Sequence, residues 1–157
     1  DLNSAMQNSV NWYFQAIDSQ LGINRVQGFL NKIEYGNQTT SSNLDLYWSD
    51  FSLKISPLEQ VTLLKKFNTN EFHLNSQNVF SVKNAIKIAS TPNGNFYGKT
   101  GTGRVNGQDI NGWFIGYVET SDNSYYFATN IQSDSNATGK KAFEITSDIL
   151  KKLHIWN

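Results

Sequence analysis

Apolar residues recur at three- and four-residue spacing in the first part of the chain, which predicts helices there. Residues 4–19 place an apolar stripe on one face of a helix, and Gly22 offers a C-cap just beyond it. A second amphipathic helix is expected over residues 24–33. The polar residues 38–43 then predict a loop.

A helix start follows at Ser56-Pro57-Leu58-Glu59, because the serine can cap, the proline fits the first turn and the glutamate can reach back. This helix should run to about Phe67. Another should begin near Ser76 and continue through Val79, Val82, Ile86 and Ile88. The segment Thr91-Pro92-Asn93-Gly94 predicts a turn.

The pattern then changes to strands, expected over residues 95–99, 112–120 and 124–131, the last two joined as a hairpin. A final helix is predicted over residues 138–153, with a buried face formed by Phe143, Ile145, Ile149, Leu150 and Leu153. Helices first and a hairpin-linked antiparallel sheet later indicate an α+β fold.

Composition narrows the classes of protein and site. The 157 residues are 38% apolar, which favours one compact domain, and 13 basic side chains balance 13 acidic ones, which gives no case for nucleic acid or anionic lipid. There is no cysteine and no apolar run long enough to span a bilayer. His73 and His154 are too few and isolated for a metal site, so we expect them at the surface.

The chain is rich in large aromatics, with ten Phe, seven Tyr and four Trp. A carbohydrate-binding module would have such a composition, but aromatic side chains more often form the core. The composition alone therefore leaves a binding module open as the weakest alternative.

The segment Lys99-Thr100-Gly101-Thr102-Gly103 closes a predicted strand and places an ammonium, two hydroxyls and accessible backbone amides together. Such an edge can bind an anion, and the lysine can help to move a proton. A solvated glycine-rich strand end is the simpler reading of a Lys-Thr-Gly triplet. Nucleotide binding is excluded because the spacing of a phosphate loop is absent.

Ser9 and Asn11 lie on or beside the first predicted helix, where a solvated polar pair is the ordinary interpretation. Their order along the chain with the other motifs changes that balance. Ser9-Val10-Asn11, Tyr35-Gly36-Asn37, Trp48, the Lys99–Gly103 segment and Gly112-Trp113-Phe114-Ile115-Gly116-Tyr117 together resemble class D β-lactamases. They resemble still more closely the extracellular β-lactam sensor domains of BlaR/MecR-type receptors.

The resemblance implies a β-lactamase/transpeptidase-like fold and a site that holds a β-lactam antibiotic. Lys99 and Ser9 match the pair that binds near the substrate carboxylate and passes a proton to the leaving nitrogen. Thr100 and Thr102 match the carboxylate-binding hydroxyls beside Gly101, and the Thr102 amide matches an oxyanion donor. Trp48 matches the indole that hydrogen-bonds a carboxylated lysine.

Three departures qualify the resemblance. These proteins acylate the serine of an S-x-x-K motif, which residues 1–157 do not contain. We therefore expect the C-terminal part of a single penicillin-binding domain, whose N-terminal segment would be a partner of this chain and would carry the lysine carbamate formed from carbon dioxide. No other cofactor and no metal are expected. Many class D enzymes also have an arginine near the start of the last helix, where this chain has Ala142.

Asn11 is the third departure and separates the candidate functions. Class D enzymes commonly have valine at this position, whereas the sensors resemble this chain. An amide can favour decarboxylation of the lysine, after which the acyl adduct persists. We therefore expect a slowly deacylating β-lactam sensor at the extracellular face of a bacterial membrane, attached only through a receptor portion outside the chain. A class D hydrolase, secreted or lipid-anchored, and a cell-wall transpeptidase remain alternatives.

Overall fold

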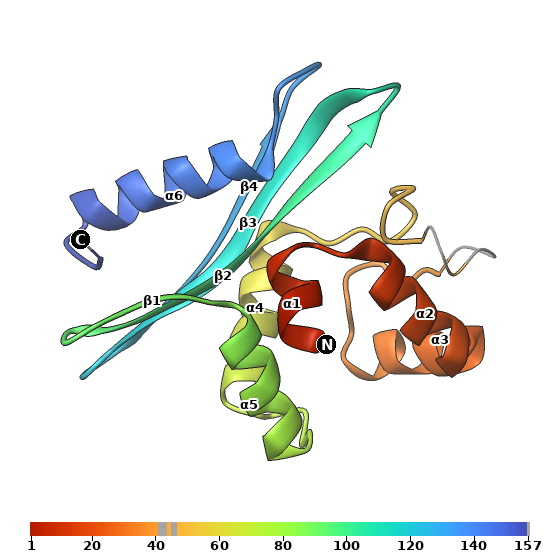
Figure 1. Ribbon diagram of the computed structural model, residues 1–157, viewed down its shortest axis with the longest axis horizontal. Coiled ribbons are helices and arrows are strands. Elements are labelled where there is room, and N and C mark those ends of the chain that lie inside the picture. The colour runs from red at the N-terminus through yellow and green to blue at the C-terminus, as the bar shows by residue number, and fades with distance from the viewer. Residues whose placement is uncertain (41–43, 45–46, 157) are drawn as a thin grey trace. The chain divides into compact units, whose positions relative to one another are not determined.

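The computed structural model describes residues 1–40, 44 and 47–156 and confirms the α+β class. The chain divides into two compact units, unit 1 (Asp1–Ala85) and unit 2 (Ile86–Asn157). Helices make up the regular structure of unit 1, and unit 2 contains an antiparallel sheet with one flanking helix (Figure 1). Residues 41–43 of the predicted loop lie outside the described residues.

Unit 1 contains α1 (Leu2–Gln7), α2 (Asn11–Leu21), α3 (Ile23–Lys32), α4 (Pro57–Asn68) and α5 (Ser76–Ala85). The predicted start of α4 is confirmed: the Glu59 amide donates to Ser56 Oγ at 3.2 Å, and the Ser56 amide donates to Glu59 Oε2 at 2.8 Å. Gly22 ends α2 with a positive φ of 76°, as its position predicts.

The single helix predicted over residues 4–19 is wrong, because the chain breaks at Ser9. Ser9 has a φ of 52°, in the left-handed region. Its amide donates to the Met6 carbonyl, and the Val10 amide donates to the Ala5 carbonyl at 2.9 Å. This pair of bonds is the Schellman arrangement that ends a helix, with serine where glycine is usual. The apolar spacing continues across the break, so it does not reveal it.

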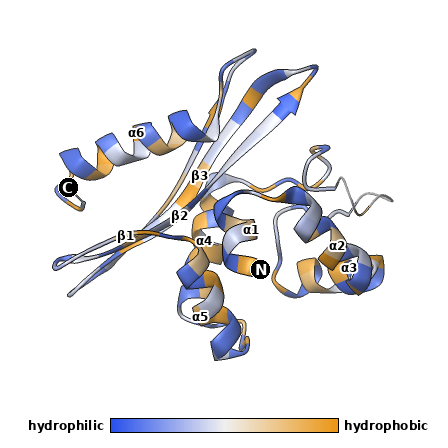
Figure 2. Cartoon of the chain, in the orientation of Figure 1, coloured by the Kyte–Doolittle hydropathy of each residue, from blue (hydrophilic) through white to orange (hydrophobic). Residues whose placement is uncertain are grey.

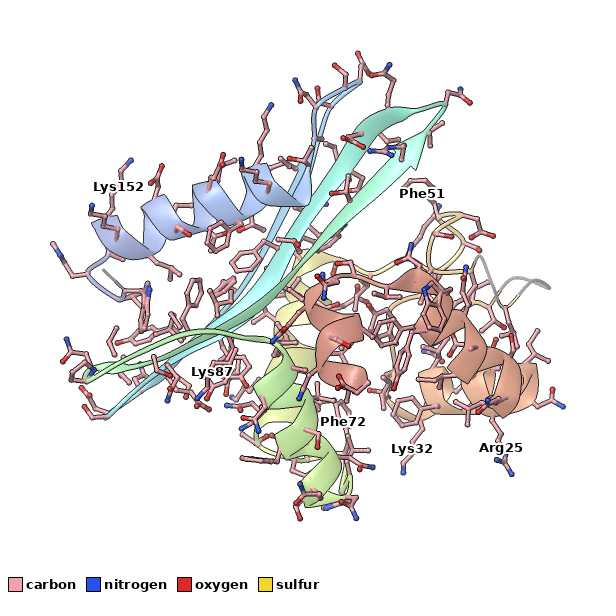
Figure 3. The ribbon with its side chains drawn as sticks, viewed as in Figure 1. Arg25, Lys32, Phe51, Phe72, Lys87 and Lys152 are labelled. Carbon is pink, nitrogen blue, oxygen red and sulfur yellow. The ribbon has the colours of Figure 1, made fainter. Side chains whose placement is uncertain are left out.

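The core of unit 1 forms between α3 and the chain that follows it. Val26, Leu30 and Tyr47 are buried together, and Tyr35, Leu44, Trp48 and Leu53 pack against them. The predicted apolar face of α3 is confirmed at Val26 and Leu30, while Phe29 is 46% exposed. On the same helix Arg25 and Lys32 extend away from the ribbon (Figure 3).

The sheet of unit 2 is an antiparallel meander in the order β1 (Lys87–Thr91), β2 (Gly94–Val105), β3 (Gln108–Thr120) and β4 (Ser124–Gln132). The predicted turn before Gly94 joins β1 to β2, and the predicted hairpin joins β3 to β4. The helix predicted through Ile88 is wrong at its end, because α5 stops at Ala85 and Ile88 belongs to β1.

Helix α6 (Gly139–Lys152) lies along one face of the sheet (Figure 1). The residues buried at this contact are Phe96, Phe114, Val118, Ala142 and Leu150. The helix was expected, but its predicted buried face is only partly right: Ile145, Ile149 and Leu153 are exposed, whereas Ala142 and Thr146 are buried. Hydrophobic and hydrophilic residues are mixed along the helix (Figure 2), and Lys152 points away from the sheet (Figure 3).

Candidate functional site

The segment Lys99–Thr102 lies within β2, which continues to Val105 rather than closing at Lys99 as predicted. Strand β3 pairs with β2 over its whole length, whereas β1 pairs with it only from Gly94 to Tyr97. The Gly98 amide still donates to the Ile86 carbonyl at 2.9 Å on the β1 side. Backbone groups alternate between the two edges of a strand, so the Thr100 and Thr102 amides point to this same side.

Beyond Tyr97, no strand among the described residues pairs with this side of β2. The strand therefore presents an edge whose amides are available to a bound group, and we call Lys99–Thr102 the β2 edge. Thr100, Gly101 and Thr102 are exposed. A Cβ at Gly101 would have only the Trp113 Cβ nearby, at 3.7 Å, which leaves room for a ligand to approach the backbone.

The polar side chains of the β2 edge point to both faces of the sheet. Phe96 lies in the core beneath α6, so Thr100 and Thr102 share that face, and Lys99 lies on the other. Lys99 Nζ donates to the Thr100 carbonyl at 2.9 Å. Burial lowers the pKa of Lys99, which increases the fraction of neutral amine near pH 7. The edge can thus supply backbone donors, hydroxyl donors and a proton carrier.

Ser9 and Asn11 come together in the turn between α1 and α2 of unit 1. Ser9 occupies the left-handed position described above, and Asn11 is the first residue of α2 after the N-cap Val10. Both residues are exposed. The sequence placed them on or beside one helix. The structure places them in the hydrogen-bonded turn that separates the two helices.

Trp48 lies in a turn of unit 1 and packs against the buried cluster of Val26, Leu30 and Tyr47. Tyr47 holds this turn, because its hydroxyl donates to Asp18 Oδ2 at 3.2 Å and its carbonyl accepts from the Leu53 amide at 3.0 Å. Burial and the Asp18 carboxylate raise the pKa of Tyr47, so the phenol stays protonated and remains a donor.

Tyr35-Gly36-Asn37 closes the base of the segment that carries Trp48. Asn37 Nδ2 donates to the Ser52 carbonyl at 2.8 Å, and Asn37 Oδ1 accepts from the Lys54 amide at 2.9 Å. Gly36 has a φ of 48°, and a Cβ there would lie 1.9 Å from the Lys54 carbonyl oxygen. The motif therefore joins two backbone segments. The sequence showed where this motif stands among the others, but it did not predict this structural role.

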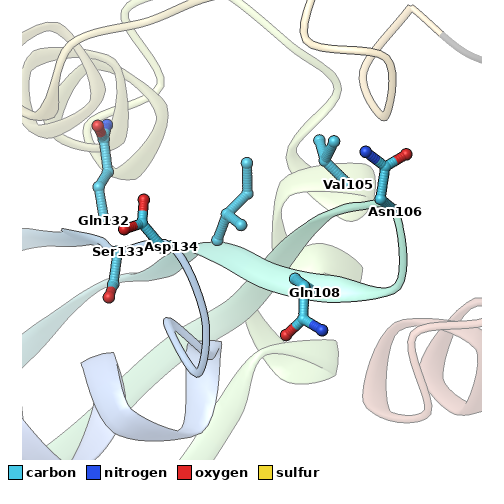
Figure 4. Close-up of a pocket in the computed structure, with 7 residues that line it drawn as sticks. Val105, Asn106, Gln108, Gln132, Ser133 and Asp134 are labelled. Atoms are coloured by element: carbon cyan, nitrogen blue, oxygen red, sulfur yellow. The ribbon is translucent and has the colours of Figure 1, made fainter.

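Unit 2 also has a surface pocket away from the β2 edge, at the turn between β2 and β3 and the end of β4 (Figure 4). Its lining residues are Val105, Asn106, Gln108, Ile110, Gln132, Ser133 and Asp134. None of the predicted site residues is among them.

Across the part of the chain that the structure describes, no group of three or more metal-ligating side chains gathers, and no helix is long and apolar enough to cross a membrane. His73 and His154 are exposed, as predicted.

Comparison with known proteins decides the family. Residues 1–151 match the model of the penicillin-binding protein transpeptidase domain. The chain belongs to this family. The C-terminal domain of the Bacillus licheniformis BlaR penicillin-receptor is 46% identical with a TM-score of 0.95, over 100% of this chain and 63% of that one. A class D β-lactamase from Bacillus subtilis is 37% identical with a TM-score of 0.90, over 99% of this chain and 63% of that one.

The methicillin resistance mecR1 protein of Staphylococcus aureus is 44% identical over 155 residues, which are 99% of this chain and 26% of that protein. The chain thus spans about a quarter of the length of this relative. These likenesses confirm the β-lactamase/transpeptidase fold expected from the motifs and the similarity to BlaR/MecR-type sensor domains.

At the position where the resemblance leads us to expect an arginine, α6 has Ala142, which is fully buried on the face of the helix that packs against the sheet. Gly139, the first residue of α6, reaches the β2 edge, and its amide donates to Thr102 Oγ1 at 2.9 Å. Sequence reasoning missed Gly139. The only local signal in the sequence was a glycine directly after a helix-capping threonine. That signal does not reveal that Gly139 contacts Thr102.

Proposed function

We propose that this chain holds the antibiotic in a β-lactam sensor, whose serine comes from an S-x-x-K segment outside residues 1–157. The observation that carries the proposal is the β2 edge, with its two outward amides, two hydroxyls and half-buried lysine. A β-lactam offers a carboxylate and a strained carbonyl. The hydroxyls and Lys99 suit the carboxylate, and the Thr102 amide suits the oxygen that becomes negative when the carbonyl is attacked.

In the proposed acylation the serine oxygen attacks the β-lactam carbonyl carbon, and the carbon–nitrogen bond of the ring breaks. The leaving nitrogen must take up a proton, which we assign to a relay of Ser9 and Lys99. The lowered pKa of Lys99 supports this role, because a lysine of ordinary pKa keeps its proton too firmly near pH 7. Trp48 would hydrogen-bond the carbamate of the S-x-x-K lysine, which supplies the general base.

Sensing rather than turnover is favoured by Asn11 at the start of α2 and by the higher identity to the BlaR penicillin-receptor than to the class D enzyme. An amide beside the carbamate would favour loss of carbon dioxide, and the acyl adduct would then persist. A receptor needs such a long-lived adduct. We place this domain at the extracellular face of a bacterial membrane, where the antibiotic arrives. A class D hydrolase is the second candidate, supported by the TM-score of 0.90.

The test uses a polypeptide that joins an S-x-x-K segment to residues 1–157, incubated with excess benzylpenicillin. We expect mass spectrometry to show one lasting adduct with the mass of the intact antibiotic. The control is residues 1–157 alone, which should gain no adduct. Disappearance of the antibiotic without a lasting adduct would favour the hydrolase and overturn the sensor.

Asn11→Val separates the same two candidates by chemistry. In a sensor, this change should stabilise the carbamate, which NMR with ¹³C-labelled bicarbonate detects, and should speed deacylation. In a hydrolase that already keeps its carbamate, both quantities should stay nearly unchanged. Asn8→Val, at the exposed end of α1, is the matched amide-to-valine control and should alter neither.

A further inference from the structure

The start of α6 lies directly against the β2 edge within unit 2. Thr138 caps the helix by accepting from the Lys141 amide at 3.2 Å, and Gly139 follows as the first helical residue. The Gly139 amide is hydrogen-bonded within the protein, because it donates to Thr102 Oγ1 at 2.9 Å. The helix start and the strand edge are therefore joined through the threonine hydroxyl.

This contact leaves no space for a side chain at residue 139. A Cβ there would lie 2.7 Å from the Gly101 carbonyl oxygen, 2.9 Å from the Thr100 Cβ and 3.0 Å from the Gly101 amide nitrogen. Ordinary carbon–oxygen contacts are about 3.3 Å or longer, so the strand or the helix would have to move by roughly 0.6 Å. Two of the three neighbours are backbone atoms, which cannot rotate away.

The bond also settles how the Thr102 hydroxyl is used. A hydroxyl has one hydrogen to donate and lone pairs to accept with. The Gly139 amide fills an accepting position on the side toward α6, so the hydrogen is left to donate away from the helix. A donor suits a carboxylate. Ala142 is fully buried and supplies no charge, so α6 contributes to carboxylate recognition through the placement of this hydroxyl, beside Thr100 and Lys99.

We propose that Gly139 is a positioning residue for carboxylate recognition: it sets the distance between α6 and Gly101 and orients the Thr102 hydroxyl as a donor to the β-lactam carboxylate. The proposal rests on the proposed function of the β2 edge. It adds that discrimination for the carboxylate depends on a residue that does not touch the ligand.

The experiment measures acylation rates of the polypeptide that includes an S-x-x-K segment, with benzylpenicillin and with its methyl ester. The ratio of the two rates reports on the carboxylate, because the ester removes its charge, weakens its accepting oxygens and adds one methyl group. Gly139→Ala should lower this acid-to-ester ratio roughly tenfold, the size of a lost hydrogen bond to a charged group. Gly28→Ala is the control, since a Cβ at this position of α3 meets nothing within 4 Å.

Two variants of Thr102 keep the test decisive if Gly139→Ala folds poorly. Thr102→Ser retains the hydroxyl that accepts from Gly139 and should keep the ratio, whereas Thr102→Val should lose it. In the Thr102→Val background, Gly139→Ala should change the ratio little, because the hydroxyl it positions is gone.

The outcomes separate the two proposals. If the unchanged polypeptide is not acylated by benzylpenicillin, the proposed function fails whatever Gly139 does. If it is acylated, and Gly139→Ala slows the acid and the ester equally or slows neither, Gly139 does not position the carboxylate site. An unchanged ratio in Thr102→Val would overturn the role of the hydroxyl.

Discussion

Ser9 holds a left-handed backbone conformation that glycine adopts at less cost, and this predicts a measurable strain. With a Cβ, the conformation costs roughly 1–2 kcal/mol. Glycine relieves that strain but loses about 0.5–1 kcal/mol more backbone entropy on folding. Ser9→Gly should therefore be more stable than Ser9→Ala by about 0.5–1 kcal/mol. Both variants lack the hydroxyl, so any bond that it makes cancels from the comparison.

The assay is urea denaturation of the two variants, followed by circular dichroism at one pH. For a chain of this size the expected difference corresponds to about 1–4 °C in Tm. If Ser9→Ala proves as stable as Ser9→Gly, the strain is not at Ser9, and the break between α1 and α2 has another cause.

The same pair tests why serine is retained there. If Ser9 belongs to the proton relay, both variants should be acylated more slowly by about a hundredfold or more, although one of them is the more stable protein. Higher stability with lower activity would indicate that the strained backbone is kept for the hydroxyl. Normal acylation in the Ser9→Gly variant would remove Ser9 from the relay.

Three further changes test the scaffold and the lysine. Gly36→Ala should lower the free energy of unfolding by about 3 kcal/mol, because its Cβ would meet the Lys54 carbonyl at 1.9 Å, whereas Gly28→Ala should not lower it; equal values in urea denaturation would contradict this. Asn37→Ala should lower the free energy of unfolding by about 2 kcal/mol in the same assay, because two hydrogen bonds are lost. An unchanged free energy would show that Asn37 does not hold the two backbone segments together. Lys99→Met should raise stability at pH 7, since folding lowers the pKa of Lys99 and so disfavours its charged form. The cost of burying the charged amine disappears as the pH rises through 10.5, above which lysine is mostly neutral in the unfolded chain as well. The gain in the free energy of unfolding from Lys99→Met should therefore shrink as the pH rises, and a gain that grows would refute the lowered pKa.

The elements that the sequence predicted well are those set by local chemistry. The capping box at Ser56 needs only residues three apart, and the hairpin turns need only their own residues. The prediction was wrong where apolar spacing continued across a boundary, as at Ser9 and at Ile88. A helix and a following strand can share such a run of apolar residues, and serine gives no sign of a left-handed turn.

The buried face of α6 shows a second limit of prediction from sequence. Five large residues were expected to form the buried face of this helix. Of these, Leu150 is buried, but Ile145 and Ile149 are exposed, and the small residues Ala142 and Thr146 are buried instead. Thr146 Oγ1 donates to the Ala142 carbonyl at 2.8 Å and lies 2.6 Å from Thr129 Oγ1 on β4. Small side chains let the helix approach closely, and that requirement depends on the partner surface, which periodicity does not describe.

The sequence supplies candidate residues for the site, but it does not reveal the residue that supports the β2 edge. Lys99, Thr100 and Thr102 could be chosen from the sequence because their chemistry is visible in the residue types. Gly139 could not, because its contribution is the absence of a Cβ near the Gly101 carbonyl. Such a contribution exists only when two segments distant in the sequence lie together.

Tyr35-Gly36-Asn37 and the β2 edge were both among the motifs that carried the resemblance, but their hydrogen-bonding groups are used differently. The side-chain amide of Asn37 donates to the Ser52 carbonyl and accepts from the Lys54 amide. This donor and this acceptor therefore bind the backbone of unit 1 and are not directed to a ligand. The β2 edge instead leaves the Thr100 and Thr102 amides facing a side where, among the described residues, no strand pairs. Ligand recognition requires groups that folding has not already consumed, so the β2 edge fits the proposed ligand-binding role, whereas Tyr35-Gly36-Asn37 serves the fold of unit 1. Substitutions in the β2 edge should change the acylation rate more than stability. Substitutions in Tyr35-Gly36-Asn37 should change stability more than the acylation rate.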